Sequence, residues 1–177
     1  MKVLVTGGAG FIGSHLTEAL LQRGCRVLVA DNLYFGERRH VPPGAEFHKL
    51  SIVSKQFASL VKRERPEVVF HLAAQTSVTF SVRDPIFDAR VNILGSLNLI
   101  RSCGEAGVRK VVYASSGGAI YGEPSSLPVG EGHPIRPASS YGLSKYTVER
   151  YLDIYRAVSG LGYTVLRLPN VYGPRQK

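Results

Sequence analysis

A tyrosine and a lysine four positions apart, Tyr141 and Lys145, are the residues of this chain best suited to chemistry on a hydroxyl group. A helix places two such positions on one face, so the ammonium of the lysine would lie one turn from the phenol. The pKa of tyrosine is usually about 10, and a neighbouring positive charge favours the phenolate. We therefore expect Tyr141 to act as a base that accepts and returns the proton of a substrate hydroxyl.

A glycine-rich turn near the N-terminus predicts the partner in that chemistry. Gly7, Gly10 and Gly13 follow the apolar run at 3–5 and open a helical pattern. Such a turn lets the backbone approach a pyrophosphate closely, and the helix N-terminus adds a partial positive charge. The spacing predicts a dinucleotide site, and the tyrosine base then predicts nicotinamide redox chemistry on an alcohol or ketone.

The residue that ends the second apolar run, Asp31, bears on which dinucleotide is bound. A carboxylate at this position accepts hydrogen bonds from the adenosine ribose and repels a 2′-phosphate, which favours NAD over NADP. Arg38 and Arg39 follow shortly afterwards and could instead favour the phosphate. We interpret them as solvated loop charges, and NAD is the expected cofactor.

The elements that must position these residues follow a β-α-β order. Strands are expected at 2–6, 26–30, 46–50, 68–72, 110–114 and 163–168, and helices at 11–23, 55–65, 88–104 and 140–159. Most of the strands are apolar along their length, as in sheets covered on both faces. The pattern predicts an α/β fold, a doubly wound parallel sheet of the Rossmann-like kind. The Gly-, Pro- and Ser-rich stretch 115–138 is expected beside the ligand crevice.

Composition limits the remaining classes of function. The 177 residues are 44% hydrophobic, enough for one globular domain, and no apolar run reaches the roughly 20 residues that span a bilayer. We expect no signal peptide, no membrane partner and a cytoplasmic location. The net charge of +9 is spread along the chain, so anionic small ligands account for it better than nucleic acid. Neither the two cysteines, Cys25 and Cys103, nor the five histidines have ligand spacing, so no metal is expected.

Together these motifs resemble the extended short-chain dehydrogenase/reductase (NAD-dependent epimerase/dehydratase) family, and within it the UDP-glucose 4-epimerases. The matching segments are TGGAGFIGSH at 6–15, DNL at 31–33, HLAAQTSV at 71–78, VNILGSLNL at 91–99, SSGGAIYG at 115–122, YGLSK at 141–145 and NVYGPRQ at 170–176. The resemblance implies an NAD-dependent epimerisation at C4 of a nucleotide sugar of the UDP-glucose/UDP-galactose type.

The resemblance also implies roles for individual residues. Tyr141, Lys145 and Ser116 would be catalytic, and Ser77 and Asn170 would contact the sugar nucleotide. Lys145 would hold the nicotinamide ribose and lower the pKa of Tyr141. NAD would be bound by Gly7, Gly10, Phe11, Ile12, Gly13, Asp31, Asn32, Ser51, Ile52, Leu72, Ala73, Ala74, Asn92, Ser115, Tyr141 and Lys145.

Three departures from the family pattern qualify these roles. Ser51 stands where the family has an aspartate beside the adenine, which weakens that contact. Gly117 stands where the family has its catalytic serine or threonine, so either Ser116 or a water must supply the hydroxyl, and we favour Ser116. Gly118 and Ala119 stand where the dehydratases carry an acidic pair, which favours epimerisation over elimination.

The expected domains are an NAD-binding domain at 1–168 and the start of a substrate-binding region at 169–177. We therefore expect this chain alone to lack turnover. The alternatives are a dehydratase or reductase of another nucleotide sugar, and a non-catalytic NAD-binding fragment. The resemblance also implies a homodimer through a four-helix bundle formed by residues 88–104 and 140–159. The side chains that could contribute to it, or could equally serve the intramolecular core, are Val91, Leu94, Leu97, Ile100 and Leu152.

Overall fold

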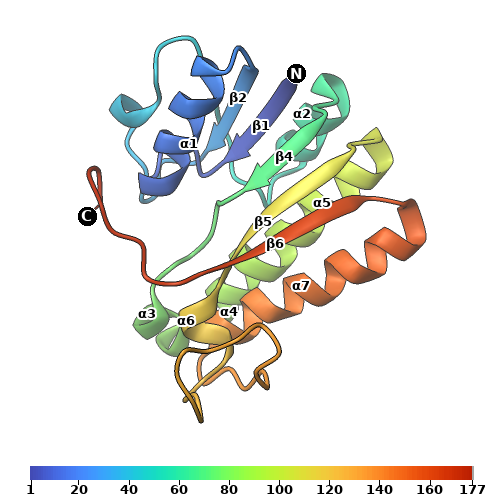
Figure 1. Cartoon of the computed structure of the whole chain (residues 1–177). Coiled ribbons are helices and arrows are strands. Elements are labelled where there is room, and N and C mark those ends of the chain that lie inside the picture. Colours follow the sequence, from blue (N-terminus) through green and yellow to red (C-terminus); the bar gives the residue numbers. More distant parts are fainter. Residues whose placement is uncertain (177) are drawn as a thin grey trace.

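The computed structural model describes residues 1–176, which form one parallel sheet of six strands in the order β3-β2-β1-β4-β5-β6 (Figure 1). The strands are β1 (Lys2–Thr6), β2 (Arg26–Asp31), β3 (Glu46–Lys49), β4 (Val68–His71), β5 (Lys110–Ser116) and β6 (Gly162–Leu168). Because β1 lies between β2 and β4, the chain order reverses beside it, and the crevice of such a sheet lies at the carboxyl ends of these strands. The predicted doubly wound α/β fold is confirmed.

Helices are present at the four predicted places, one of them with a different start, and α3 (Val78–Arg83) and α6 (Gly117–Ile120) lie where no helix was predicted. The other helices are α1 (Phe11–Gln22), α2 (Lys55–Glu64), α4 (Pro85–Ala89), α5 (Gly95–Ala106) and α7 (Ser140–Ser159), with a short 3₁₀ turn at Arg38–His40. The single helix predicted at 88–104 is wrong at its start, because Asp84 caps a helix that begins at Pro85 and a π-helical turn follows at Arg90–Leu94. None of the helices within residues 1–176 is long and apolar enough to span a membrane.

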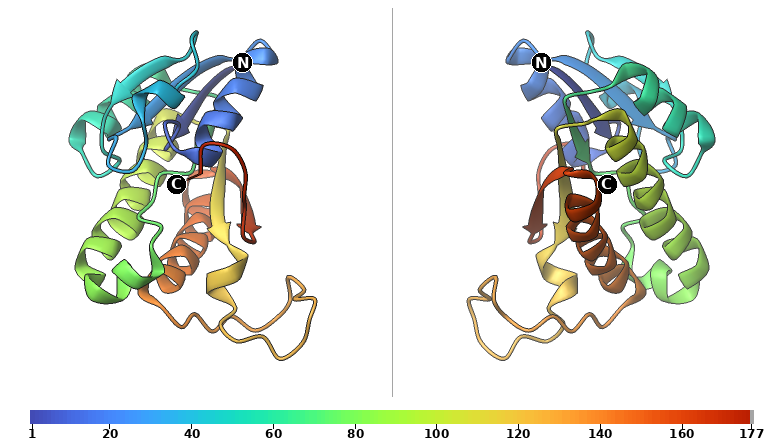
Figure 2. Two further views of the ribbon diagram at one scale, coloured as in Figure 1. Left: turned by 90° about the vertical axis from the view of Figure 1, so that its left-hand side faces the viewer. Right: turned by 90° about the vertical axis from the view of Figure 1, so that its right-hand side faces the viewer.

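Two apolar clusters hold the sheet, one on each face. Successive residues of a strand point to opposite faces. Leu4 therefore packs in the cluster with Leu99 of α5 and Leu152 of α7, whereas Val3 and Val5 pack in the other cluster with Leu20 of α1. Helices α5 and α7 lie side by side on one face (Figure 2). The strand β6, at the edge of the sheet, is less buried than the others.

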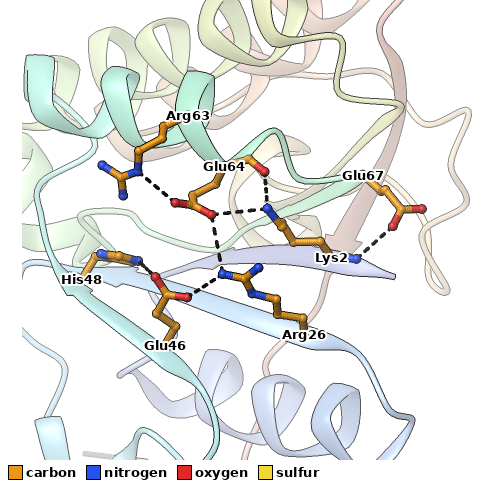
Figure 3. Close-up of polar contacts among 7 residues, drawn as sticks. All are labelled: Lys2, Arg26, Glu46, His48, Arg63, Glu64 and Glu67. Atoms are coloured by element: carbon orange, nitrogen blue, oxygen red, sulfur yellow. Dashed lines mark hydrogen bonds and ion pairs between the residues drawn. The ribbon is translucent and has the colours of Figure 1, made fainter.

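A network of charged side chains joins α2 to the strands at the amino ends of β1 and β2 (Figure 3). Glu64 accepts from Lys2 Nζ at 3.3 Å and from Arg63 Nε at 2.9 Å. Arg26 lies between Glu64, at 3.8 Å, and Glu46 of β3, at 3.2 Å. His48 contacts Glu46, and Glu67 accepts from the backbone N–H of Lys2. These contacts lie at the opposite end of the sheet from the crevice.

We expect Glu64→Gln to lower the Tm of the chain by a few degrees and to flatten the loss of stability in acid. The hydrogen bonds from Arg63 and Lys2 hold the pKa of Glu64 below its usual value. Its carboxylate therefore adds stability that is complete above about pH 4.5 and is lost as the pH falls further. Thermal unfolding followed by circular dichroism from neutral to acid pH measures this effect. Glu123→Gln, in the loop after α6, is the control, and an equal change in that variant would contradict the prediction.

Candidate functional site

In the glycine-rich turn between β1 and α1, two glycines lie so close to neighbouring backbone atoms that no side chain would fit. Gly7 has φ of 72°, and a Cβ on it would lie 2.7 Å from the backbone nitrogen of Ala73. A Cβ on Gly13 would lie 2.1 Å from the carbonyl oxygen of Gly7. Within the described residues no side chain caps α1 at Gly10, so the first N–H groups of the helix face the crevice without a capping partner. This cradle fits the pyrophosphate of a dinucleotide.

Asp31 at the end of β2 supports this turn as well as facing the crevice. Its Oδ2 accepts from the backbone N–H of Ala9 at 3.0 Å, and its Oδ1 accepts from that of Leu33 at 2.8 Å. Each carboxylate oxygen keeps a second lone pair that can accept from a ribose hydroxyl. The carboxylate therefore links the predicted ribose contact to the shape of the phosphate-binding turn.

The two arginines that could favour a 2′-phosphate have other partners. The guanidinium of Arg38 lies 4.7 Å from the centroid of the Phe47 ring. Arg39 Nε lies 2.6 Å from Glu37 Oε2, and its side chain is largely exposed. Neither arginine is among the described residues that line the cleft. Their positions agree with the interpretation of both as surface charges and leave Asp31 as the charged group at the ribose end.

A cleft of about 730 Å³ runs along the carboxyl ends of the strands from Asp31 to Tyr141. Most residues predicted to bind cofactor or substrate line it. They are Gly7, Gly10, Phe11, Ile12, Gly13, Asp31, Asn32, Ser51, Ile52, Leu72, Ala73, Ala74, Ser115, Ser116, Tyr141, Lys145 and Asn170. The fold thus gathers residues from every part of the chain along one elongated surface whose shape suits a dinucleotide.

Two of the predicted contact residues lie elsewhere in the described part of the chain. The hydroxyl of Ser77 caps α3 by accepting from the N–H of Phe80 at 3.2 Å. Asn92 is 2% exposed and lies behind the cleft, where its amide bonds to Gln75 and Asp88. Asn92 therefore supports the cleft wall from behind, and a ligand contact for either residue stays a prediction.

Aromatic side chains at the ribose end of the cleft were missed in the sequence. Tyr34 and Phe35 follow Asp31 in the loop after β2, and their ring centroids are 4.7 Å apart. Phe87 of α4 lies 6.0 Å from Tyr34 and also lines the cleft. Two adjacent, exposed aromatic residues in a ligand-side loop are a usable sequence signal for the first pair. The contact with Phe87 depends on tertiary packing.

Helix α7 holds the Tyr141–Lys145 pair in a fixed position. Ser139 caps the helix by accepting from the N–H of Gly142 at 3.1 Å, and Ser81 of α3 accepts from the N–H of Tyr141 at 3.0 Å. The ammonium of Lys145 lies 5.6 Å from the centroid of the Tyr141 ring and donates to the carbonyl of Ala114 at 2.9 Å. The one-turn spacing predicted in the sequence thus brings the two side chains together beside the end of β5.

Burial dominates the acid–base properties of this pair. It raises the pKa of Tyr141, which a hydrogen bond with Ser116 lowers and the charge of Asp88 raises again. Burial lowers the pKa of Lys145 to about 8, against the opposing effect of Asp88. In setting the direction for Tyr141, loss of solvation of the phenolate outweighs the opposing effect of Ser116. That Lys145 and a bound nicotinamide ring together lower the pKa of Tyr141 stays a prediction.

Of the candidate hydroxyl residues at the end of β5, Ser116 is the one that acts to lower the pKa of Tyr141. The hydroxyl of Ser115 instead donates to Glu149 of α7 at 2.5 Å. Position 117 is crowded, because a Cβ on Gly117 would lie 3.0 Å from the carbonyl oxygen of Arg167. The choice of Ser116 over a water as the replacement for the hydroxyl missing at position 117 stays a prediction.

The segment after β6 turns back toward α1 (Figure 1). Arg175 donates to Glu18 at 2.9 Å, and the carbonyl of Pro174 lies 3.0 Å from His15 Nε2. Asn170 lines the cleft near Gly118. The predicted region 169–177 therefore faces the ligand side of the sheet, with Lys177 outside the described residues.

Comparison with known proteins agrees with this geometry. Residues 3–177 match the family described as the NAD dependent epimerase/dehydratase family. A putative UDP-glucose 4-epimerase of Methanocaldococcus jannaschii is 46% identical over 174 residues, which cover 98% of this chain and 57% of that protein. The UDP-glucose 4-epimerase of Mycolicibacterium smegmatis is 46% identical over 181 residues, covering 99% of this chain and 58% of that protein.

Two solved structures have nearly the same fold. The UDP-glucose 4-epimerase of Thermotoga maritima, solved with UDP-glucose, superposes with a TM-score of 0.97 at 47% identity, covering 100% of this chain and 58% of that chain. The UDP-glucose 4-epimerase of Thermus thermophilus, solved as a complex with NAD, superposes with a TM-score of 0.96 at 50% identity, with the same coverage. This chain thus spans between half and two thirds of the length of these relatives.

Proposed function

The chain belongs to the NAD-dependent epimerase/dehydratase family, and on that basis we propose that it binds NAD and serves the epimerisation of a UDP-sugar at C4. The observation that carries the proposal is the cleft, with Asp31 and the glycine turn at one end and Tyr141, Ser116 and Lys145 at the other. The names of the relatives support the reaction. The domain division proposed is an NAD-binding domain at 1–168 and the start of a substrate-binding region at 169–177.

In the proposed reaction the protein handles the proton of the sugar hydroxyl. NAD, when bound, would supply the acceptor and donor of the hydride at C4. Tyr141 accepts the hydroxyl proton during oxidation and donates it back during reduction, with Ser116 hydrogen-bonded to the reacting oxygen. Proton and hydride are both returned, so one turnover consumes neither. Lys145 adds its positive charge beside the phenol and holds the nicotinamide ribose.

The two alternative reactions are elimination by a dehydratase and net reduction by a reductase, and each can be distinguished from epimerisation. Gly118 and Ala119 occupy the place of the acidic pair used for elimination, which disfavours a dehydratase. A reductase would consume reduced cofactor stoichiometrically, and measuring its net consumption distinguishes it from an epimerase. For the 177 residues alone, NAD binding without turnover is the competing proposal, since the chain spans only part of its relatives' length.

Calorimetric titration with NAD, followed by titration of the NAD-saturated chain with UDP-glucose, tests the proposal. Binding of both ligands would support a sugar-nucleotide site within these residues. Binding of NAD alone would support the cofactor half of an epimerase. Binding of neither ligand by a folded chain would overturn the proposed cofactor site.

We expect the chain to bind NAD about ten to a hundred times more tightly than NADP, because Asp31 would face the 2′-phosphate with a like charge. Asp31→Ala is expected to weaken NAD binding and to reduce the ratio of NAD affinity to NADP affinity. The same calorimetric titration, carried out with each dinucleotide, measures both affinities. Arg38→Ala is the matched control and should leave both affinities unchanged, since Arg38 packs on Phe47. If Arg38→Ala lost NADP binding but kept NAD binding, Arg38 would be shown to bind the 2′-phosphate.

We also propose a cytoplasmic homodimer in which α5 and α7 face a second copy. Of the apolar residues considered for that interface, Ile100 and Leu152 are each 1% exposed and belong to the intramolecular core. Leu94 is exposed, as are Leu143 and Val158 of α7, so these side chains support the proposed contact. Light scattering on the purified protein measures the oligomeric state.

A further inference from the structure

We propose that Asp88 is a positioning residue for the Tyr141–Lys145 pair: its buried carboxylate holds the first turns of α7 through Ser144 and supplies the counter-charge for the Lys145 ammonium. The inference deepens the proposed function and rests on it for its relevance to catalysis. The contacts of Asp88 themselves are independent of any ligand.

The carboxylate of Asp88, the penultimate residue of α4, is completely buried and surrounded by donors. Its Oδ1 accepts from Gln75 Nε2 and from Asn92 Nδ2, both at 2.9 Å. Its Oδ2 accepts from the hydroxyl of Ser144 at 2.6 Å. All three donors are neutral, and within residues 1–176 no cation lies within 4.0 Å of Asp88. A buried carboxylate without a contacting cation is costly unless a nearby positive charge compensates it.

That positive charge is Lys145, the neighbour of Ser144 on α7. Lys145 is 3% exposed, and its direct hydrogen bond is to the neutral carbonyl of Ala114. The charge of Asp88 raises the pKa of Lys145 and so opposes the effect of burial. In the proposed arrangement these two buried charges compensate one another across the packed interface between α4 and α7, which the Asp88–Ser144 hydrogen bond spans.

The other titratable groups around this interface do not replace Asp88. Burial, with the charge of Lys145, lowers the pKa of His71 to about 3, so the imidazole is neutral. Burial and the nearby charges raise the pKa of Tyr113, which is neutral too. Glu149, one turn beyond Lys145, is paired with Arg167 at 2.8 Å. Asp88 is thus the buried carboxylate left to compensate Lys145.

The partners of Asp88 connect it to the wall of the cleft. Gln75 and Asn92 exchange two further hydrogen bonds, from Gln75 N to Asn92 Oδ1 at 2.8 Å and from Asn92 Nδ2 to Gln75 O at 2.9 Å. Gln75 directly follows Ala73 and Ala74, which line the cleft. One side chain therefore ties the loop after β4 to the helix that carries the tyrosine and the lysine.

The test is the titration of Lys145 in the chain labelled with ¹³C at lysine Cε, with the resonance assigned by its loss in Lys145→Met. Asp88→Asn removes the negative charge that raises the pKa of Lys145. We therefore expect the midpoint of the Lys145 titration to fall from near pH 8 to about pH 7 or below. Asp84→Asn, four residues earlier on the exposed surface, makes the same chemical change and should leave the midpoint in place. A folded Asp88→Asn chain with an unchanged Lys145 midpoint would overturn the proposal.

A double variant keeps the test decisive where Asp88→Asn does not fold. If the two charges compensate one another, Asp88→Asn/Lys145→Met should have a higher Tm than Asp88→Asn alone. A double variant no more stable than Asp88→Asn would overturn the proposal. Neither measurement uses NAD or a sugar nucleotide, so failure here is distinguishable from failure of the proposed function.

Discussion

Tyr141→Phe is expected to lower the kcat of the proposed epimerisation by about 10²–10⁴-fold while leaving the affinity for NAD within a few-fold of the original. The substitution removes the hydroxyl that exchanges the proton and keeps the ring that packs beside Lys145. Burial raises the pKa of the phenol, so in the proposed reaction Ser116 and the nearby ammonium of Lys145 serve to make the phenol useful as a base. Without the hydroxyl, residue 141 can no longer accept or return the proton of the substrate.

The experiment compares interconversion of UDP-glucose and UDP-galactose with NAD affinity measured by calorimetry. Tyr146→Phe is the matched control, since Tyr146 lies on the same helix but lines a separate hollow beside β6. A Tyr141→Phe enzyme that keeps most of its kcat would show that another group moves the proton. An equal loss of NAD affinity would assign the residue to cofactor binding.

Gly13→Ala is expected to abolish measurable NAD binding and to destabilise the chain by about 1–3 kcal/mol. The added Cβ would lie 2.1 Å from the carbonyl oxygen of Gly7, a backbone atom that can move only with the whole turn. Moving the turn pushes α1 away from β1 and opens the pyrophosphate cradle. The expected result is a lower Tm together with the loss of heat on titration with NAD.

Gly130→Ala separates this clash from a general effect of replacing glycine. A Cβ at position 130 would meet nothing within 4 Å, so both the Tm and the NAD affinity should remain unchanged. Gly10→Ala, whose Cβ would lie 3.2 Å from the same oxygen of Gly7, should have an intermediate effect. If Gly13→Ala bound NAD normally, the turn would not be the cradle that we propose.

The sequence predicted those parts of the site that depend on local order. The glycine turn, Asp31 at a strand end and the one-turn spacing of Tyr141 and Lys145 all follow from neighbours along the chain. Asp88 and Gln75 were missed because a buried carboxylate is recognised only once its partners are known. Ser144 donates to Asp88 from a position 56 residues later in the chain. The double role of Asp31 was missed for the same reason, since its partner Ala9 lies 22 residues earlier.

The direction of the pKa of Tyr141 was also out of reach of the sequence. A lysine one turn away predicts a lower pKa, but the net direction depends on how much solvent the fold removes from the phenol. The structure buries the ring between α7 and the end of β5, and burial prevails. The direction of the Ser115 hydroxyl likewise required the path of β5, which points it toward Glu149.

The charged network around Glu64 has a consequence for engineering this protein. It occupies the amino ends of the strands (Figure 3), whereas the residues of the proposed reaction line the cleft at the carboxyl ends. Substitutions that adjust heat or acid tolerance can therefore be made around Lys2, Arg26 and Glu64 without altering the ligand cleft. Because distant sites contribute to stability almost additively, such changes can be combined with variants of the cleft and each effect measured separately.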